Sequence, residues 1–281
     1  MKRLSIYCLL IFCVILTASA QQTKQLVVLQ TSDTHSRIEP IDPHAADPYA
    51  GMGGVVRRAT FLKDFRAKNR DVLLFDCGDI SQGTPYYNLF QGEVEIKMMN
   101  LMNYDAMTIG NHEFDFGLDN MARLFRMADF PVVCANYDVT GTVLEGLVKP
   151  YVILERGGVR IGVFGLSPKM KGLVQADKCE GIVYNDPIAV AQKVIDRLRI
   201  EEKCDVVICL SHLGIRSKSG DCDEKLVAET KGIDVILGGH SHTFMEKPVF
   251  YLDAEGKTTP VLHTGKSGIF VGELNLTLIE E

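Results

Sequence analysis

Five short apolar runs in this chain each lead into residues that can bind a transition metal. The runs cover residues 26–30, 72–77, 107–109, 206–210 and 235–237. They are followed, in this order, by Asp33 and His35, by Asp79, by Asn111 and His112, by His212, and by His240 and His242. In open α/β sheets, ligands bind beyond the carboxyl ends of the strands. The pattern therefore predicts one shared site, and so many potential ligands favour a hydrolase with two metal ions.

Residues 1–20 have the features of an export signal. Lys2 and Arg3 precede an apolar stretch over residues 4–17, and Ala18, Ser19 and Ala20 form a small-residue cleavage site. An uncleaved membrane anchor is the alternative, although the apolar stretch is shorter than a spanning helix usually needs. We expect an exported protein, either periplasmic, secreted or at the cell surface. After removal of the signal peptide, residues 25–281 would form a catalytic domain without membrane attachment.

The charge of the chain excludes one class of partner. The formal net charge is −6, and it becomes −8 once Lys2 and Arg3 are removed with the signal. Proteins that bind nucleic acid polymers carry a basic stripe, so we expect no such partner. A small anionic substrate remains compatible, because bound metal ions dominate the local charge. The wide separation of the candidate ligands, from Asp33 to His242, favours a single domain.

Hydrophobic periodicity predicts helices alternating with strands. The expected helices cover residues 55–68, 93–101, 119–127 and 187–200, and Asp186 is the expected N-cap of the last one. Two β-hairpins are expected, one over residues 151–164 and one over residues 248–263, with a final half-buried strand over residues 271–279. Because hairpins accompany strand–helix units, we expect mixed sheets rather than one parallel sheet.

Six of the eight cysteines lie outside the expected signal peptide. Cys77, Cys134 and Cys209 lie in or beside apolar strand runs, so we expect them to be small buried hydrophobic residues. Cys179, Cys204 and Cys222 lie in polar stretches, where an exported chain could join two of them. Their spacing matches no zinc motif. The sequence leaves the disulfide question open.

Two of the candidate ligand pairs have the same spacing. Asp33 and His35 are two residues apart, and on extended backbone both would point to the same face and reach one ion. His240 and His242 repeat this spacing after two glycines, which would let their loop approach an ion closely. Taken alone, Asp33 and His35 could instead be turn and capping residues.

The remaining candidates would complete a two-metal site. Asp79 has two carboxylate oxygens and could bridge two ions, although it could also be a turn residue. Asn111 can bind a metal through its amide oxygen, whereas His112 points elsewhere, toward a substrate. Asp115 could accept a hydrogen bond from His112 and raise its basicity. His212 alone would be interpreted as structural, but beside the other candidates we interpret it as a ligand.

The order of these motifs resembles the calcineurin-like metallophosphoesterases. The order is Asp-x-His, Gly-Asp, Gly-Asn-His-Glu, His and Gly-Gly-His-x-His. The closest resemblance is to the N-terminal catalytic domain of the 5′-nucleotidase/UDP-sugar hydrolase family, and it extends from residue 25 to about residue 279. It is carried by residues 32–39, 53–57, 78–84 and 104–115.

The resemblance implies a fold and a set of residue roles. The fold would be a four-layer α/β/β/α sandwich with two mixed β-sheets. One ion would be held by Asp33, His35, Asp79 and His242, and the other by Asp79, Asn111, His212 and His240. The catalytic dyad would be His112 and Asp115. The family often has Gln where His242 stands. These ligand types suit Zn, Mn, Fe, Co or Ni.

The resemblance also implies a reaction. We expect hydrolysis of phosphate monoesters, with nucleoside 5′-phosphates favoured, by attack of a metal-activated water. The family continues into a second domain that binds the nucleobase, and this sequence ends where that domain would begin. We therefore expect either a separate chain that supplies it or weak base discrimination. The alternatives are a sugar-nucleotide pyrophosphatase, a cyclic-nucleotide phosphodiesterase, a sulfur-ester hydrolase and a non-catalytic binding subunit.

Overall fold

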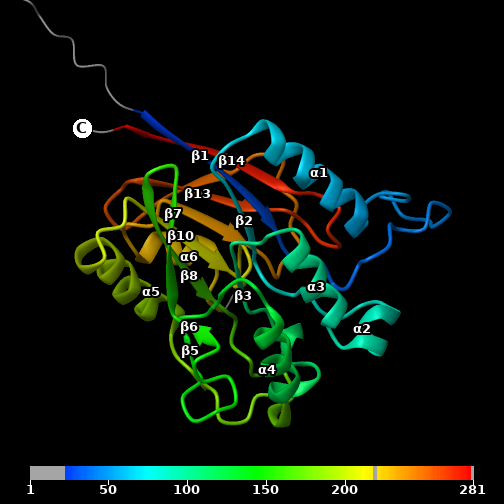
Figure 1. The fold of residues 1–281 in the computed structure, drawn as a ribbon. Coiled ribbons are helices and arrows are strands. Elements are labelled where there is room, and N and C mark those ends of the chain that lie inside the picture. The colour runs from blue at the N-terminus through cyan, green and yellow to red at the C-terminus, as the bar shows by residue number, and fades with distance from the viewer. Residues whose placement is uncertain (1–22, 218–219, 280–281) are drawn as a thin grey trace, which may run out of the picture.

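Two six-stranded sheets form the centre of the molecule. The computed structural model describes residues 23–217 and 220–279, so the expected signal peptide lies outside the described residues. The two sheets have the strand orders β14-β1-β2-β3-β4-β6 and β12-β13-β11-β10-β8-β7, and Figure 1 shows helices on their outer sides. The predicted four-layer α/β/β/α arrangement is confirmed. Among the described residues, no helix is both long and apolar enough to cross a membrane.

The first sheet is mixed, as predicted. Its antiparallel edge is formed by β14 against β1, and the remaining strands pair in parallel. The strands are β1 (Thr23–Thr31), β2 (Val72–Asp76), β3 (Ala106–Thr108), β4 (Val132–Val133), β6 (Val148–Lys149) and β14 (Gly272–Ile279). The carboxyl ends of β1, β2 and β3 consequently lie at the same edge of this sheet.

The second sheet contains both predicted hairpins. Antiparallel pairs form at its two edges, β7 with β8 and β12 with β13, and the inner pairs are parallel. The strands are β7 (Tyr151–Arg156), β8 (Val159–Leu166), β10 (Val206–Ser211), β11 (Val235–Gly238), β12 (Val249–Leu252) and β13 (Thr258–His263). A small third sheet pairs β5 (Tyr137–Asp138) with β9 (Val183–Tyr184).

The helices agree closely with the predicted ranges. They are α1 (Val55–Lys68), α3 (Glu93–Leu101), α4 (Gly117–Met127) and α5 (Pro187–Asp196), which continues into a π-helical turn over Arg197–Glu201. Asp186 caps α5 as predicted, because its side chain accepts hydrogen bonds from the backbone N–H groups of Ile188 and Ala189. Two short helices were not predicted, α2 (Pro85–Phe90) and α6 (Asp223–Glu229).

Alternating side chains explain the four layers. In β2, Leu73 and Phe75 are buried between the two sheets, whereas Val72 and Leu74 are buried under the helices. Strand β10 of the second sheet has the same alternation, because Ile208 is buried between the two sheets and Val207 is buried under the helices. Fully burying a side chain of this size contributes about 1.5–3 kcal/mol. Both faces of each sheet are therefore apolar, and each needs a covering layer.

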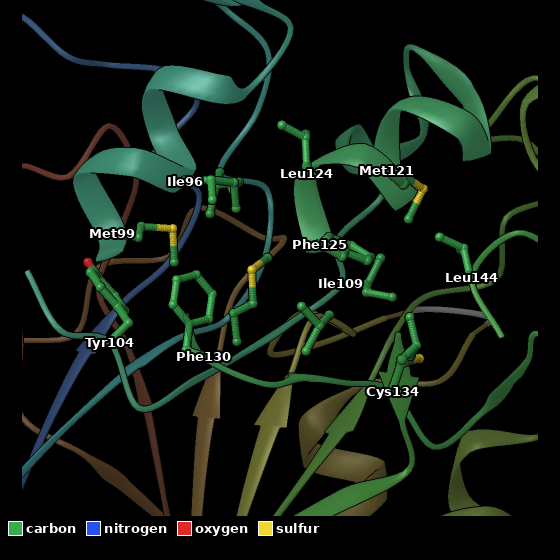
Figure 2. Close-up of a cluster of buried hydrophobic side chains, with 14 of the residues drawn as sticks. Ile96, Met99, Tyr104, Ile109, Met121, Leu124, Phe125, Phe130, Cys134 and Leu144 are labelled. Carbon is green, nitrogen blue, oxygen red and sulfur yellow. The ribbon is translucent and has the colours of Figure 1, made fainter. Parts of the chain in front are cut away.

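Three apolar clusters correspond to the three interfaces between the layers. Figure 2 shows part of the cluster under α3 and α4, including Ile96, Met99, Leu124, Phe125 and Phe130. The opposite outer cluster packs α5 and α6 against β8, β10 and β11. Because all three interfaces are closed by apolar side chains, the polar candidate residues gather at one edge, beyond the strand ends.

The cysteines are all free thiols within the described residues. Cys77, Cys134 and Cys209 are buried, as predicted. Cys204 and Cys222 are also buried despite their polar surroundings in the sequence, and Cys179 is partly buried. No disulfide joins any of these six residues in the structure.

Candidate metal centre

The candidate ligands meet where the two sheets face each other. Asp33 and Asp79 lie beyond β1 and β2 of the first sheet, whereas His212 and His240 lie beyond β10 and β11 of the second. Their side chains form two groups in which one potential ligand atom per residue lies within 4.8 Å of the others. The first group contains Asp33, His35 and His242, and the second contains Asp79, His212 and His240.

The loops that carry these residues are turned rather than extended. Positive φ angles occur at Asp33 (50°), His35 (47°), Asp79 (56°), His240 (71°) and His242 (51°). The prediction from extended backbone was therefore wrong about local geometry. The turned backbone separates His240 and His242 into different groups, although Asp33 and His35 share one. Such angles cost about 1–3 kcal/mol each in residues other than glycine and concentrate at functional sites.

Backbone carbonyls orient two of the histidines. The Nδ1 atom of His212 lies 2.6 Å from the carbonyl oxygen of Cys77, and that of His35 lies 3.2 Å from the carbonyl oxygen of Ser81. A carbonyl oxygen only accepts, so Nδ1 donates in both histidines. In a neutral ring, Nε2 is then the atom whose lone pair can bind a metal, the arrangement usual for metal-binding histidines. Nε2 of His35 lies 2.9 Å from Nε2 of His242 in the same group of potential ligands.

Two buried polar atoms at the second group lack hydrogen-bond partners. They are Nε2 of His212 and the amide oxygen of Asn111. Asn111 precedes His112, whose backbone N–H donates to Oδ1 of Asp79 over 2.8 Å, so Asn111 lies at the edge of this group. Buried polar atoms almost always have a partner. A nitrogen and an oxygen without partners beside the buried carboxylate of Asp79 fit the ligands of a divalent cation.

The charges in the site are strongly coupled. Burial raises the pKa of Asp33 to about 6, opposed by His212 and reinforced by Asp79. Burial also acts against the charged forms of Asp79 and His212, but their mutual attraction prevails. It lowers the pKa of Asp79 below its usual range and raises the pKa of His212 to about 10. The acidic pair Asp33 and Asp79 thus draws positive charge into the site.

The other histidines are held in the neutral form. Burial, followed by the charge of His212, lowers the pKa of His240 to about 4. Burial, followed by the charges of His35 and Lys266, lowers the pKa of His242 to about 4. Burial also lowers the pKa of His35. A neutral imidazole is the form that binds a metal, so all three side chains suit that role near neutral pH.

His112 and Asp115 form a pair beside these groups. The Nδ1 atom of His112 lies 3.0 Å from Oδ2 of Asp115, and both side chains are about one third exposed, 30% and 35%. The hydrogen bond that His112 donates to Asp115 raises the pKa of His112, against an opposing effect of burial. The His112 ring lies edge-on to the ring of His35, with 5.5 Å between the centroids. His112 is thus oriented at the site, and the structure places it outside both groups of potential ligands.

Glu113 has a role that the sequence did not indicate. Its buried carboxylate accepts hydrogen bonds from the backbone N–H groups of Asp79 (3.1 Å), Ile80 (2.9 Å) and Gly110 (2.5 Å). Burial, reinforced by the charge of Asp79, raises the pKa of Glu113 to about 7. Glu113 therefore joins the loop after β2 to the loop after β3. The sequence shows only that Glu113 directly follows His112, and this position does not predict its role.

A second buried network supports the loops of the other sheet. Asp223 accepts a hydrogen bond from the hydroxyl of Ser211 at the end of β10, and its Oδ2 lies 2.6 Å from Nε2 of His263 at the end of β13. A side chain at Gly238, the last residue of β11, would overlap the His263 ring. All three network residues are at most 1% exposed. The network therefore joins the end of β10, which precedes His212, to the end of β13. It also packs closely against the end of β11, which precedes His240.

Comparison with known proteins agrees with this geometry. The family pattern of the calcineurin-like phosphoesterases matches residues 26–244 of the chain. The chain belongs to the calcineurin-like phosphoesterase family. The match extends from β1 to just beyond His242. The matched region therefore includes every strand end that precedes a candidate residue.

The similar proteins of this phosphoesterase include several 5′-nucleotidases. It is 32% identical to the snake venom 5′-nucleotidase of Crotalus adamanteus over 94% of this chain and 47% of that protein. It is 30% identical to the 5′-nucleotidase of Homo sapiens over 91% and 47%, respectively. The crystal structure of a 5′-nucleotidase precursor from Thermus thermophilus superposes with a TM-score of 0.82, at 32% identity, over 89% of this chain and 51% of that chain. The chain thus spans about half the length of the relatives that it matches.

Proposed function

We propose that residues 25–281 form the catalytic domain of an exported two-metal phosphoesterase that hydrolyses phosphate monoesters, with nucleoside 5′-phosphates as its favoured substrates. The observation that carries this proposal is the meeting of two groups of potential ligands beside the His112–Asp115 pair. Export is supported only by the sequence of residues 1–20. The nucleotide preference is supported by the names of the relatives.

Each ion would have ligands from both sheets. Asp33, His35 and His242 would hold one ion, and His212, His240 and Asn111 the other, with Asp79 shared between them. Asp79 suits a shared position because its Oδ2 lies 3.1 Å from Nε2 of His212 in the second group. Its charge also raises the pKa of Asp33 in the first group. When bound, two divalent ions would activate a water molecule and polarise the phosphoryl oxygens.

His112 would act directly on the substrate. Its Nδ1 is held by Asp115, which leaves Nε2 available. This hydrogen bond raises the pKa of His112 and so favours the protonated form of the ring. From Nε2, it would donate a hydrogen bond to a phosphoryl oxygen or a proton to the leaving oxygen. Asp115 would fix the tautomer and orientation of the ring. A pure binding subunit would have no need of this pair.

A substrate panel tests the proposal. The purified mature chain, loaded with Mn or Zn, would be assayed with 4-nitrophenyl phosphate, nucleoside 5′-monophosphates, a sugar nucleotide and a cyclic nucleotide. We expect turnover of the monoesters, a preference for the nucleoside monophosphates, and loss of turnover on chelation of the metal. Turnover restricted to the diester or the pyrophosphate would contradict the proposed substrate class. Metal binding without turnover of any substrate would favour the non-catalytic alternative.

A further inference from the structure

A small recess lined by aromatic rings lies next to the first group of ligands. We call it the aromatic recess; its volume is about 250 Å³. The residues that line it include Tyr49, Phe244, Phe270, Arg37, Lys266 and His242. Pockets that bury drug-sized ligands usually measure about 300–1,000 Å³, so the aromatic recess suits a smaller group, such as one ring system.

Three aromatic rings build one side of the aromatic recess. Phe244 and Phe270 are stacked, with 4.1 Å between their centroids and 27° between their planes. Tyr49 stands edge-on against Phe270, with 5.6 Å between the centroids. Phe270 contacts both other rings and so fixes one face of Phe244, which nevertheless remains 45% exposed. A fixed and exposed aromatic face beside a cavity is a surface on which a further planar ring can stack.

The aromatic recess is attached to the same loops as the ligands. The backbone N–H of Ser267 donates to the carbonyl oxygen of Asp33 over 2.7 Å, and that of Gly265 donates to Thr243 over 2.9 Å. An isolated β-bridge joins Phe244 to Thr264. His242 belongs both to the first group of ligands and to the lining of the aromatic recess. A group that fills it would therefore be directly adjacent to a phosphoryl group at the proposed metal centre.

The polar residues of the aromatic recess favour a ring with polar edges over a hydrocarbon. Arg37 and Lys266 bring two cations, and Nε of Arg37 is buried without a hydrogen-bond partner. Asp47 adds a carboxylate at the same recess, and one of its oxygens accepts a hydrogen bond from the backbone N–H of Tyr49 over 2.8 Å. An aromatic face with both donors and acceptors beside it matches a heteroaromatic ring.

We infer that the aromatic recess binds the planar heteroaromatic ring of the substrate's leaving group, such as a nucleobase, with Phe244 as the stacking surface. This inference rests on the proposed function, because it assumes that the phosphoryl group lies at the metal centre. It gives the catalytic domain a ring-binding surface of its own. The sequence did not predict this surface, because Tyr49, Phe244 and Phe270 lie far apart in the sequence.

Binding measurements test this inference independently of turnover. Titration calorimetry would compare the non-hydrolysable phosphonate analogues of adenosine 5′-monophosphate and of ribose 5-phosphate, which differ in the presence of the base. The proteins would be the metal-loaded wild type, Phe244→Leu and the control Phe250→Leu. Phe250 is 62% exposed on β12 and does not line the aromatic recess. Circular dichroism of each variant would verify the fold.

We expect wild type and Phe250→Leu to bind the nucleotide analogue about tenfold more tightly than the sugar phosphate analogue, the effect of one base–aromatic stack. In Phe244→Leu, this ratio should fall close to one. An unchanged ratio in a folded Phe244→Leu would overturn the inference, as would equal affinities in the wild type. Absence of turnover alongside the expected ratios would instead contradict the proposed function and leave the ring-binding site established.

Discussion

Nε2 of His212 lies 3.1 Å from Oδ2 of Asp79, yet no hydrogen bond of acceptable geometry joins them. The two residues follow strands of different sheets, β10 and β2, and both side chains are at most 3% exposed. The other oxygen of Asp79, Oδ1, accepts a hydrogen bond from the backbone N–H of His112. Asp79 thus connects a potential ligand of the second sheet with the residue proposed to act on the substrate.

Replacing His112 should separate catalysis from metal binding. We expect His112→Asn to lower kcat by about 10²–10⁴-fold, the usual effect of losing a general acid or a charge stabiliser. Metal content should not change, because His112 lies outside both groups of ligands. Steady-state kinetics and metal analysis of the same preparation check both parts. Loss of metal from the variant would show that His112 is itself a ligand.

Asp115→Asn provides the graded comparison. An amide at this position can still accept a hydrogen bond from Nδ1 of His112, but it carries no charge. We therefore expect a smaller fall in kcat than for His112→Asn, with metal content retained. A fall as large as that of His112→Asn would assign Asp115 more than an orienting role.

Glu113 should be essential for the stability of the site. Glu113→Ala leaves the buried N–H groups of Asp79, Ile80 and Gly110 without their acceptor. Each such group costs about 1–3 kcal/mol, so we expect the free energy of unfolding to fall by roughly 3 kcal/mol or more. Glu113→Gln, which keeps one acceptor oxygen, should lie between the wild type and the alanine variant. Urea unfolding in the presence of a chelator measures the free energy of unfolding without a contribution from bound metal. Equal stability of all three proteins would contradict this role of Glu113.

The parts of the fold that depend on local signals could be predicted. The range of α1 follows from its apolar spacing, and the hairpin of β7 and β8 follows from Gly157 and Gly158 at its turn. Helices α2 and α6 were missed because each has fewer than eight residues. Helices this short are not stable by propensity alone and depend on tertiary packing.

The candidate site was predicted as a set of residues but not as a geometry. Positive φ angles are uncommon in residues other than glycine, so the sequence did not predict the turned backbone at Asp33 and His240. The roles of Glu113 and His263 depend on which backbone segments lie beside them, and those segments are distant in the sequence. The sequence therefore predicted which residues could bind a metal or act on a substrate. It did not predict the hydrogen bonds that hold their loops together.

The Asp223–His263 pair should stabilise the loops of the second sheet. In His263→Ala, the buried carboxylate of Asp223 loses its hydrogen bond to Nε2, and we expect a loss of about 1.5–3 kcal/mol in the free energy of unfolding. His263→Gln should recover part of this loss, because its amide can still donate. Metal affinity should also fall in His263→Ala, because Ser211 in the network precedes His212.

The exposed histidine His44 provides the matched control. His44→Ala should change the stability by no more than about 0.5 kcal/mol, as surface substitutions usually do. Urea unfolding and metal titration of the three variants distinguish the possibilities. If His263→Ala behaved like His44→Ala, the network would be dispensable for the site.

The number of bound metal ions tests the central claim most directly. The chain would be stripped with a chelator, reloaded with Mn or Zn, and analysed by mass spectrometry of its metal content. We expect two equivalents for the wild type, a decrease at both sites for Asp79→Ala, and loss of mainly one ion for His212→Ala. One equivalent or fewer in the reloaded wild type would contradict a two-metal centre built from the two groups of ligands.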